Sequence, residues 1–127
     1  MKEIGGGSIV NVGSFSWMCS QGGMPGYTTA KSAIAGLTKT LARDLGEYNI
    51  RVNCVCPGSI DTPLLRAAAE LTGNSQQAIE EWADAHVLKR VGQPEEVAQV
   101  VLFLASNKAS FITGAAYVVD GGLITQL

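Results

Sequence analysis

The chain has 127 residues, of which 46% are hydrophobic and 16% charged, and its net charge is −2. This length indicates a single domain, residues 1–127, with a core of its own, and the composition excludes a disordered chain. The weakly acidic charge and the lack of a basic run argue against nucleic acid and membrane surfaces as partners. No apolar run reaches the roughly 18 residues of a membrane helix, and the first residues lack the apolar segment of a signal peptide, so we expect a cytoplasmic protein.

Three cysteines and one histidine limit the metal chemistry open to the chain: Cys19, Cys54, Cys56 and His86. No Cys-x-x-Cys pair occurs, so we expect no zinc site and assign no metal ligands. Cys54 and Cys56 are two residues apart in a strand-like run, which places them on one face without the geometry of a disulfide. We therefore expect free thiols, and a surface or helix-end position for His86.

In chain order, the pattern alternates between strands and helices. A β-branched run predicts a strand at about 8–13, and a second and a third follow at 50–56 and 115–119. A long amphipathic helix is predicted from 27 to about 48, and shorter ones at 64–71, 75–86 and from Pro94 onward. The apolar stripe of the long helix comprises Ala30, Ala33, Ile34, Leu37, Leu41 and Leu45. Strands separated by helices imply an α/β fold, with a parallel sheet covered on both faces.

The chemistry-bearing residues gather between the first strand and the long helix. Tyr27 and Lys31 are four residues apart at the helix start, so they lie on one face, where the Lys31 ammonium favours an ionised Tyr27. Such a phenol can exchange a proton with an alcohol or carbonyl oxygen. Ser14 follows the first strand, at the edge of a parallel sheet where ligands commonly bind. On most helices a Tyr-x-x-x-Lys pair is only a solvated surface feature. The rest of the sequence must therefore decide whether this pair is catalytic.

The chain contains five segments in order, the first two of which include Ser14, Tyr27 and Lys31: GGGSIVNVGS, YTTAK, IRVNCVCPGSIDTPL, RVGQPEEVAQVVLFLAS and FITGAAYVVDGG. Together they resemble the carboxyl-terminal half of the short-chain dehydrogenase/reductase family, over nearly the whole chain. The resemblance implies a partial Rossmann-like fold, three parallel strands with flanking helices. It also implies an oxidoreductase dependent on NAD or NADP that interconverts a small-molecule alcohol and a carbonyl by hydride transfer, and a homo-oligomer. The loop 13–17 is similar to one in sugar and polyol dehydrogenases of the family.

The resemblance also implies roles for single residues. Ser14 would stabilise the substrate oxygen, Tyr27 would be the general acid and base, and Lys31 would tune Tyr27. Tyr27 and Lys31 would in addition contact the cofactor, Lys31 through the nicotinamide ribose. Gly13 stands where the family often has Ser.

The segment after the second strand is implied to hold the nicotinamide. Pro57 and Gly58 would shape the loop beneath the ring, while the Ile60 backbone and the Thr62 side chain would meet its carboxamide. A second interpretation of Thr62 is a cap on the helix that follows, and the two roles are compatible.

The family's nucleotide-binding half has no counterpart in this sequence. No G-x-G-x-x-G turn joins a strand to a helix, because the glycines 5–7 precede a strand. We therefore expect a nicotinamide half-site only, little or no activity of the chain alone, and an unpaired apolar edge on the first strand. The alternative is a non-enzymatic oligomerisation or complementation fragment of a dehydrogenase that associates through the helix at 28–47.

Overall fold

The computed structural model describes residues 1–19 and 22–126, and it confirms the α/β class. Three parallel strands form one sheet in the order β1 (Gly7–Val12), β2 (Ile50–Pro57) and β3 (Ala116–Val119). Each strand end lies within one residue of its prediction. The β1–β2 register begins with Gly7 opposite Ile50, and the β2–β3 register begins with Cys54 opposite Ala116.

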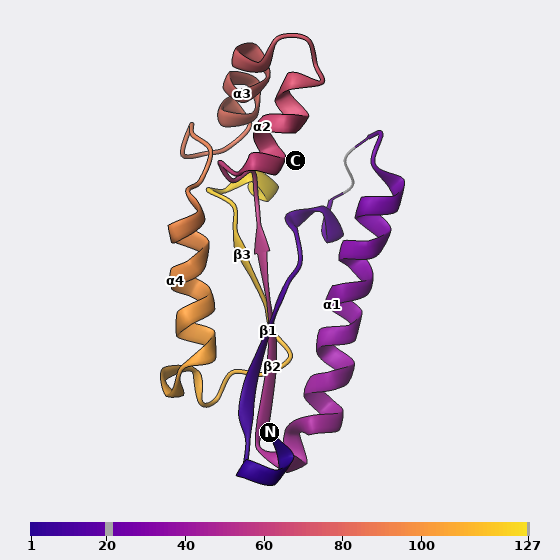
Figure 1. The fold of residues 1–127 in the computed structure, drawn as a ribbon, viewed down its shortest axis with the longest axis vertical. Coiled ribbons are helices and arrows are strands. Elements are labelled where there is room, and N and C mark those ends of the chain that lie inside the picture. Colours follow the sequence, from indigo (N-terminus) through magenta and orange to yellow (C-terminus); the bar gives the residue numbers. More distant parts are fainter. Residues whose placement is uncertain (20–21, 127) are drawn as a thin grey trace.

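Helices cover both faces of this sheet, as expected for parallel strands. Figure 1 shows α1 (Pro25–Leu45) along one face and α4 (Pro94–Ala105) along the other. The short helices α2 (Pro63–Glu70) and α3 (Ser75–Asp84) lie beyond the carboxyl ends of the strands. Single 3₁₀ turns occur at Lys2–Ile4, Phe15–Trp17, Gly46–Tyr48, Asn107–Ala109 and Leu123–Thr125.

The long helix α1 differs from its prediction in the face it buries. Its fully buried residues are Ala35, Thr38 and Ala42, none of which belongs to the predicted stripe. Within that stripe Leu37 is 51% exposed, whereas Leu41 and Leu45 are partly buried against the core. Small side chains let the helix approach β2 closely, so they take the inner positions despite the larger apolar residues beside them. The helix also ends at Leu45 rather than near 48, because a 3₁₀ turn and a left-handed residue lead the chain into β2.

The central strand β2 anchors the rest of the fold through buried polar side chains. The Arg51 guanidinium donates to the carbonyl oxygens of Leu104 and Ser106, at 2.8 and 2.9 Å, and so caps the carboxyl end of α4. The fully buried Asn53 amide donates to the carbonyl of Ile112 at 2.8 Å. These bonds fix α4 and the turn before β3 to the sheet.

The opposite edge of the sheet is open. β1 pairs with β2 and with no other strand in the part of the chain that the structure describes, which agrees with the predicted free edge. Within the same described ranges, every helix is too short or too polar to cross a lipid bilayer.

Candidate active site

Ser14 lies where β1 ends and the chain turns toward α1. Its backbone is extended and its hydroxyl oxygen accepts the Ser16 N–H at 3.2 Å, so it caps the 3₁₀ turn Phe15–Trp17. The side chain is 4% exposed. This cap fixes the Ser14 hydroxyl at the carboxyl edge of the sheet, the edge at which open α/β sheets bind ligands.

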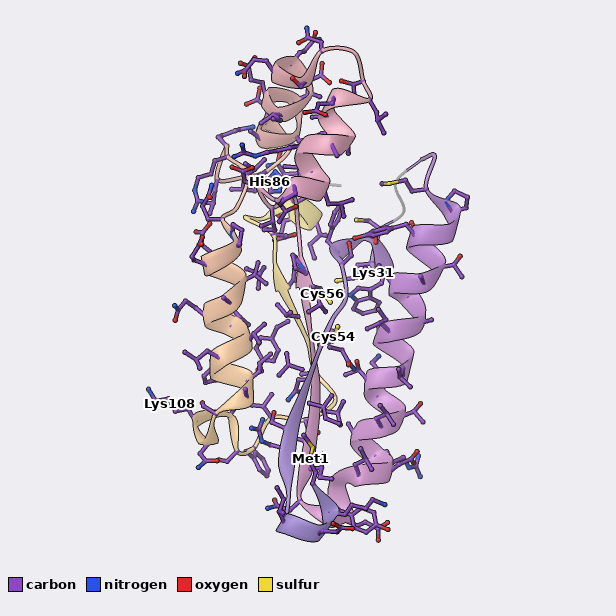
Figure 2. All side chains as sticks on the ribbon, viewed as in Figure 1. Met1, Lys31, Cys54, Cys56, His86 and Lys108 are labelled. Carbon is purple, nitrogen blue, oxygen red and sulfur yellow. The ribbon has the colours of Figure 1, made fainter. Side chains whose placement is uncertain are left out.

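Lys31 joins the first turns of α1 to that edge. Its ammonium donates to the carbonyl oxygen of Val12 at 3.0 Å and lies 5.6 Å from the centre of the Tyr27 ring. In Figure 2 the Lys31 side chain lies between α1 and the strands, above Cys54 and Cys56. The structure thus brings Lys31 to Tyr27 and to the end of β1, two residues before Ser14.

Tyr27 itself is 41% exposed in the first turn of α1, so its phenol is open to a small molecule. Among the described residues, Ser14 and Tyr27 share no hydrogen bond. Their joint contact with one substrate oxygen therefore remains a prediction from the sequence.

The segment after β2 is held from three sides. Gly58 donates its N–H to the Val119 carbonyl at 3.0 Å, and Ser59 donates its N–H to the His86 ring at 3.3 Å. A Cβ on Gly58 would lie 2.8 Å from the Asp120 Cα, so only glycine fits against this neighbour. The Thr62 hydroxyl accepts the Leu65 N–H at 3.3 Å, which confirms its predicted role as the cap of α2.

The backbone N–H and C=O of Ile60 point away from Gly92, its neighbour across a short bridge. It pairs with Gly92 in an isolated parallel bridge, whose two hydrogen bonds run from Gly92 to the Ser59 carbonyl and from Asp61 to the Gly92 carbonyl, both 2.9 Å. In a parallel bridge the residue between the bonding pair offers neither its N–H nor its C=O to the partner. The Ile60 N–H and C=O therefore face the other side of the segment. Together they offer one donor and one acceptor, which complement the C=O and NH₂ of a primary carboxamide.

His86 contacts the segment after β2, which the sequence did not reveal. It lies just beyond the end of α3, as the helix-end alternative predicted, whereas the surface alternative is wrong, because the side chain is 1% exposed. Its Nδ1 lies 2.6 Å from the Trp82 carbonyl, which requires an N–H there, and its Nε2 accepts from Ser59. A single histidine after an amphipathic helix carries no sequence signal for this bridge, which tertiary packing creates.

A cavity of about 260 Å³ lies beside His86 at the carboxyl end of β3, and Ser59 and Ile60 also line it. Ser14, Tyr27 and Lys31 do not line it. It therefore lies beside the segment after β2 rather than at the predicted catalytic residues.

Gly13, directly before Ser14, is in contact with the two buried cysteines of β2. The prediction of free thiols on one face is confirmed, and the two sulfurs are 3.7 Å apart. A Cβ on Gly13 would lie 2.8 Å from the Cys54 sulfur and 3.1 Å from the Cys56 sulfur. Gly13 and the two thiols therefore fit together as a unit beneath the candidate site.

The fold and this arrangement define a Rossmann-like α/β protein with its polar residues at the carboxyl edge of a parallel sheet. A family model described as "Enoyl-(Acyl carrier protein) reductase" matches residues 1–124. The 3-oxoacyl-acyl-carrier-protein reductase FabG of Chlamydia muridarum is 44% identical over 123 residues, covering 97% of this chain and 47% of that protein. Cyclohexanol dehydrogenase of an Acinetobacter species is 45% identical over 122 residues, covering 96% of this chain and 45% of that protein.

Solved structures agree with these relatives. L-sorbose reductase of Gluconobacter frateurii, in complex with NADPH and L-sorbose, superposes with a TM-score of 0.93 at 37% identity, over all of this chain and 51% of that one. Ligand-free aldohexose dehydrogenase of Thermoplasma acidophilum gives 0.90 at 46% identity, over 94% of this chain and 49% of that one. The chain belongs to the short-chain dehydrogenase/reductase family, and it spans about half the length of the relatives it matches.

Proposed function

We propose that the chain carries the proton-transfer and nicotinamide-binding half of an oxidoreductase that uses NAD or NADP to interconvert an alcohol and a carbonyl. One observation supports this most directly. The Lys31 ammonium is fixed to the Val12 carbonyl at the end of β1 and stands 5.6 Å from the Tyr27 ring, with Ser14 two residues further on. The names of two relatives also support an alcohol or carbonyl substrate: cyclohexanol dehydrogenase is named for an alcohol and L-sorbose reductase for a ketose.

In this proposal the three side chains handle the proton and the charge. The Tyr27 hydroxyl donates its proton to the substrate oxygen as a carbonyl becomes an alcohol, and takes it back in the reverse direction. The Lys31 ammonium stabilises the tyrosinate that remains. The Ser14 hydroxyl donates a hydrogen bond to the same oxygen and stabilises the charge that develops there.

The nicotinamide cofactor supplies the hydride when it is bound. The Ile60 N–H and C=O suit its carboxamide, and the Thr62 side chain lies at the start of α2 beside them. Pro57, the last residue of β2, and Gly58 would shape the loop that holds the ring, and Lys31 would contact the ribose. These residues fit the nicotinamide end of either NAD or NADP.

For the substrate we propose a small alcohol or carbonyl compound of the sugar or polyol class. Two structural relatives, aldohexose dehydrogenase and L-sorbose reductase, are named for sugars. We propose a homo-oligomer, because the open edge of β1 leaves backbone groups for association. The cytoplasmic location expected from the sequence remains part of this proposal.

The catalytic assignment is tested in a chimera, in which residues 1–127 replace the matching half of Chlamydia muridarum FabG. Tyr27→Phe is expected to lower kcat by about 10²–10⁴, since it removes the transferred proton. Tyr48→Phe is the matched control, because Tyr48 lies at the far end of α1 against Lys2 and should leave kcat unchanged. Equal activity of the Tyr27 variant and its control would refute the assignment.

Lys31 is tested in the same chimera. Lys31→Met is expected to lower kcat and to weaken cofactor binding, whereas Lys108→Met, in the 3₁₀ turn after α4, should change neither. A Lys31 variant with the kinetics of its Lys108 control would contradict both proposed roles of the ammonium.

The isolated chain is proposed to turn over weakly or not at all, which hydride-transfer assays with NADH and NADPH over a panel of carbonyl compounds would measure.

The open β1 edge also favours a second function, complementation of a separate nucleotide-binding half. Mixing the chain with the amino-terminal half of a relative should then restore activity. Rapid turnover by the chain alone would contradict the first proposal, and light scattering that shows only heterogeneous aggregate would contradict the second.

A further inference from the structure

Cys54 and Cys56 form a closely spaced pair of thiols that the proposed reaction does not use. Both side chains extend from β2 toward α1, as Figure 2 shows. Both are fully buried, and their sulfurs are 3.7 Å apart. The third cysteine, Cys19, lies outside this pair and is only partly buried.

The surroundings activate one sulfur of the pair. The hydrogen bond with Cys56, together with those from Gly13 and Thr38, lowers the pKa of Cys54. The hydrogen bond with Cys54, together with burial, raises the pKa of Cys56. Cys54 is thus the more acidic thiol of the pair and the first to form the thiolate, the form of cysteine that attacks electrophiles.

The spacing of the sulfurs selects among the bonds they could form. A disulfide needs the sulfurs at about 2.05 Å and favours Cα atoms closer than the roughly 6.6 Å between alternate residues of a strand. A single atom bonded to both sulfurs at about 2.3 Å, the length of a thiolate–zinc bond, would instead close an angle of roughly 107°. That angle fits a pyramidal or tetrahedral centre and excludes a linear one.

The number of protein ligands narrows the choice further. Structural zinc requires four ligands. In the described ranges, no cluster of three or more His, Cys, Asp or Glu side chains could hold a metal ion. A trivalent arsenic that already carries one organic substituent needs only two sulfurs, which is what β2 offers.

We propose that Cys54 and Cys56 form a dithiol site for monosubstituted trivalent arsenicals, and that its occupation displaces Gly13 and Ser14. With an arsenic oxide, two S–H bonds and the arsenic–oxygen bond break, two arsenic–sulfur bonds form, and one water leaves. Arsenic stays trivalent and nothing is oxidised or reduced. Only the effect on Ser14 as a catalytic group rests on the proposed function.

The displacement follows from the contact between the thiols and Gly13. Even a methyl group on Gly13 would come within 2.8 Å of the Cys54 sulfur, so no space for an added atom exists on that side. An arsenic atom that enters between the sulfurs and Gly13 therefore pushes the segment that carries Ser14 away from β2. Because both sulfurs are buried, the reagent enters only when this segment opens, and the reaction is slower than at an exposed thiol.

Phenylarsine oxide is the probe, applied to the folded 127-residue chain. After a wash with excess 2-mercaptoethanol, intact mass spectrometry should find one arsenical on the wild type and on the control Cys19→Ser, and 2,3-dimercaptopropanol should release it. Cys54→Ser and Cys56→Ser should each bind at least 100-fold more weakly, because the second bond to arsenic is intramolecular. A serine variant that binds like the wild type, or a wild type that retains none, overturns the site.

Two further measurements keep the test decisive. If circular dichroism shows that a serine variant does not fold, tryptic mapping of the labelled wild type replaces it: an arsenical on the peptide 52–66 supports the site, and one on the Cys19 peptide overturns it.

Displacement of the segment is measured by tryptophan fluorescence in the variant Trp82→Phe. This variant keeps Trp17, a neighbour of the Cys56 sulfur, as its only tryptophan. Its emission should change on binding, and unchanged emission at full occupancy overturns the proposed displacement. Neither readout depends on oxidoreductase activity.

Discussion

Replacing Gly13 by serine tests how tightly the residue before Ser14 is fitted against the two thiols. The new Cβ would lie 2.8 Å from the Cys54 sulfur and 3.1 Å from the Cys56 sulfur. These atoms sit on short side chains of a central strand, so they cannot swing away. Overpacking of this kind costs about 1–3 kcal/mol. With a urea m-value of about 2 kcal/mol per molar, the unfolding midpoint should fall by roughly 0.5–1.5 M.

A double-mutant cycle then separates this clash from other effects. Cys54→Ala removes the nearer sulfur, so Gly13→Ser should cost less in that background, with a favourable coupling of about 1–2 kcal/mol. Gly36→Ser is the control, because a Cβ there meets nothing within 4 Å, and its effect should stay within about 0.5 kcal/mol of zero or stabilise the helix. Additive effects in the cycle, or a Gly13→Ser variant as stable as the wild type, would refute the reasoning.

Substitutions at three other positions test further side-chain interactions of the fold. His86→Ala should lower the free energy of unfolding by about 2–5 kcal/mol, because it leaves a cavity and an unpaired Ser59 N–H, and His86→Gln, whose oxygen can still accept that N–H, should cost less in the same urea titration. Thr62→Ala should cost about 1 kcal/mol and Thr62→Ser almost nothing, as thermal unfolding would show. Hydrogen bonds from Arg90 hold the pKa of Glu96 at about 2, so the stability they add is present above pH 4.5 and is lost as the pH falls toward 2. Glu96→Gln should flatten that part of the melting-temperature profile, and an unchanged profile would contradict the assignment.

Local patterns predicted the elements of this fold well, because β-branched runs and helix-starting prolines act over a few residues. All three strands, the cap at Thr62 and the helix beginning at Pro94 were found in this way. The buried face of α1 was predicted only in part, through Leu41 and Leu45. Apolarity favoured Leu37, but contact with β2 required the small Ala35 and Ala42, and no single-helix pattern contains the distance to the sheet.

The sequence by itself determined that Tyr27 and Lys31 share one helix face, because a four-residue step closes one turn whatever surrounds it. It could not determine that Lys31 reaches Val12, 19 residues away, because that contact depends on how the helix lies against the sheet. The bridge through His86 and the fit of Gly13 against two sulfurs were likewise decided only by tertiary structure. These are contacts between distant segments, whose spacing is set by packing rather than by any local preference.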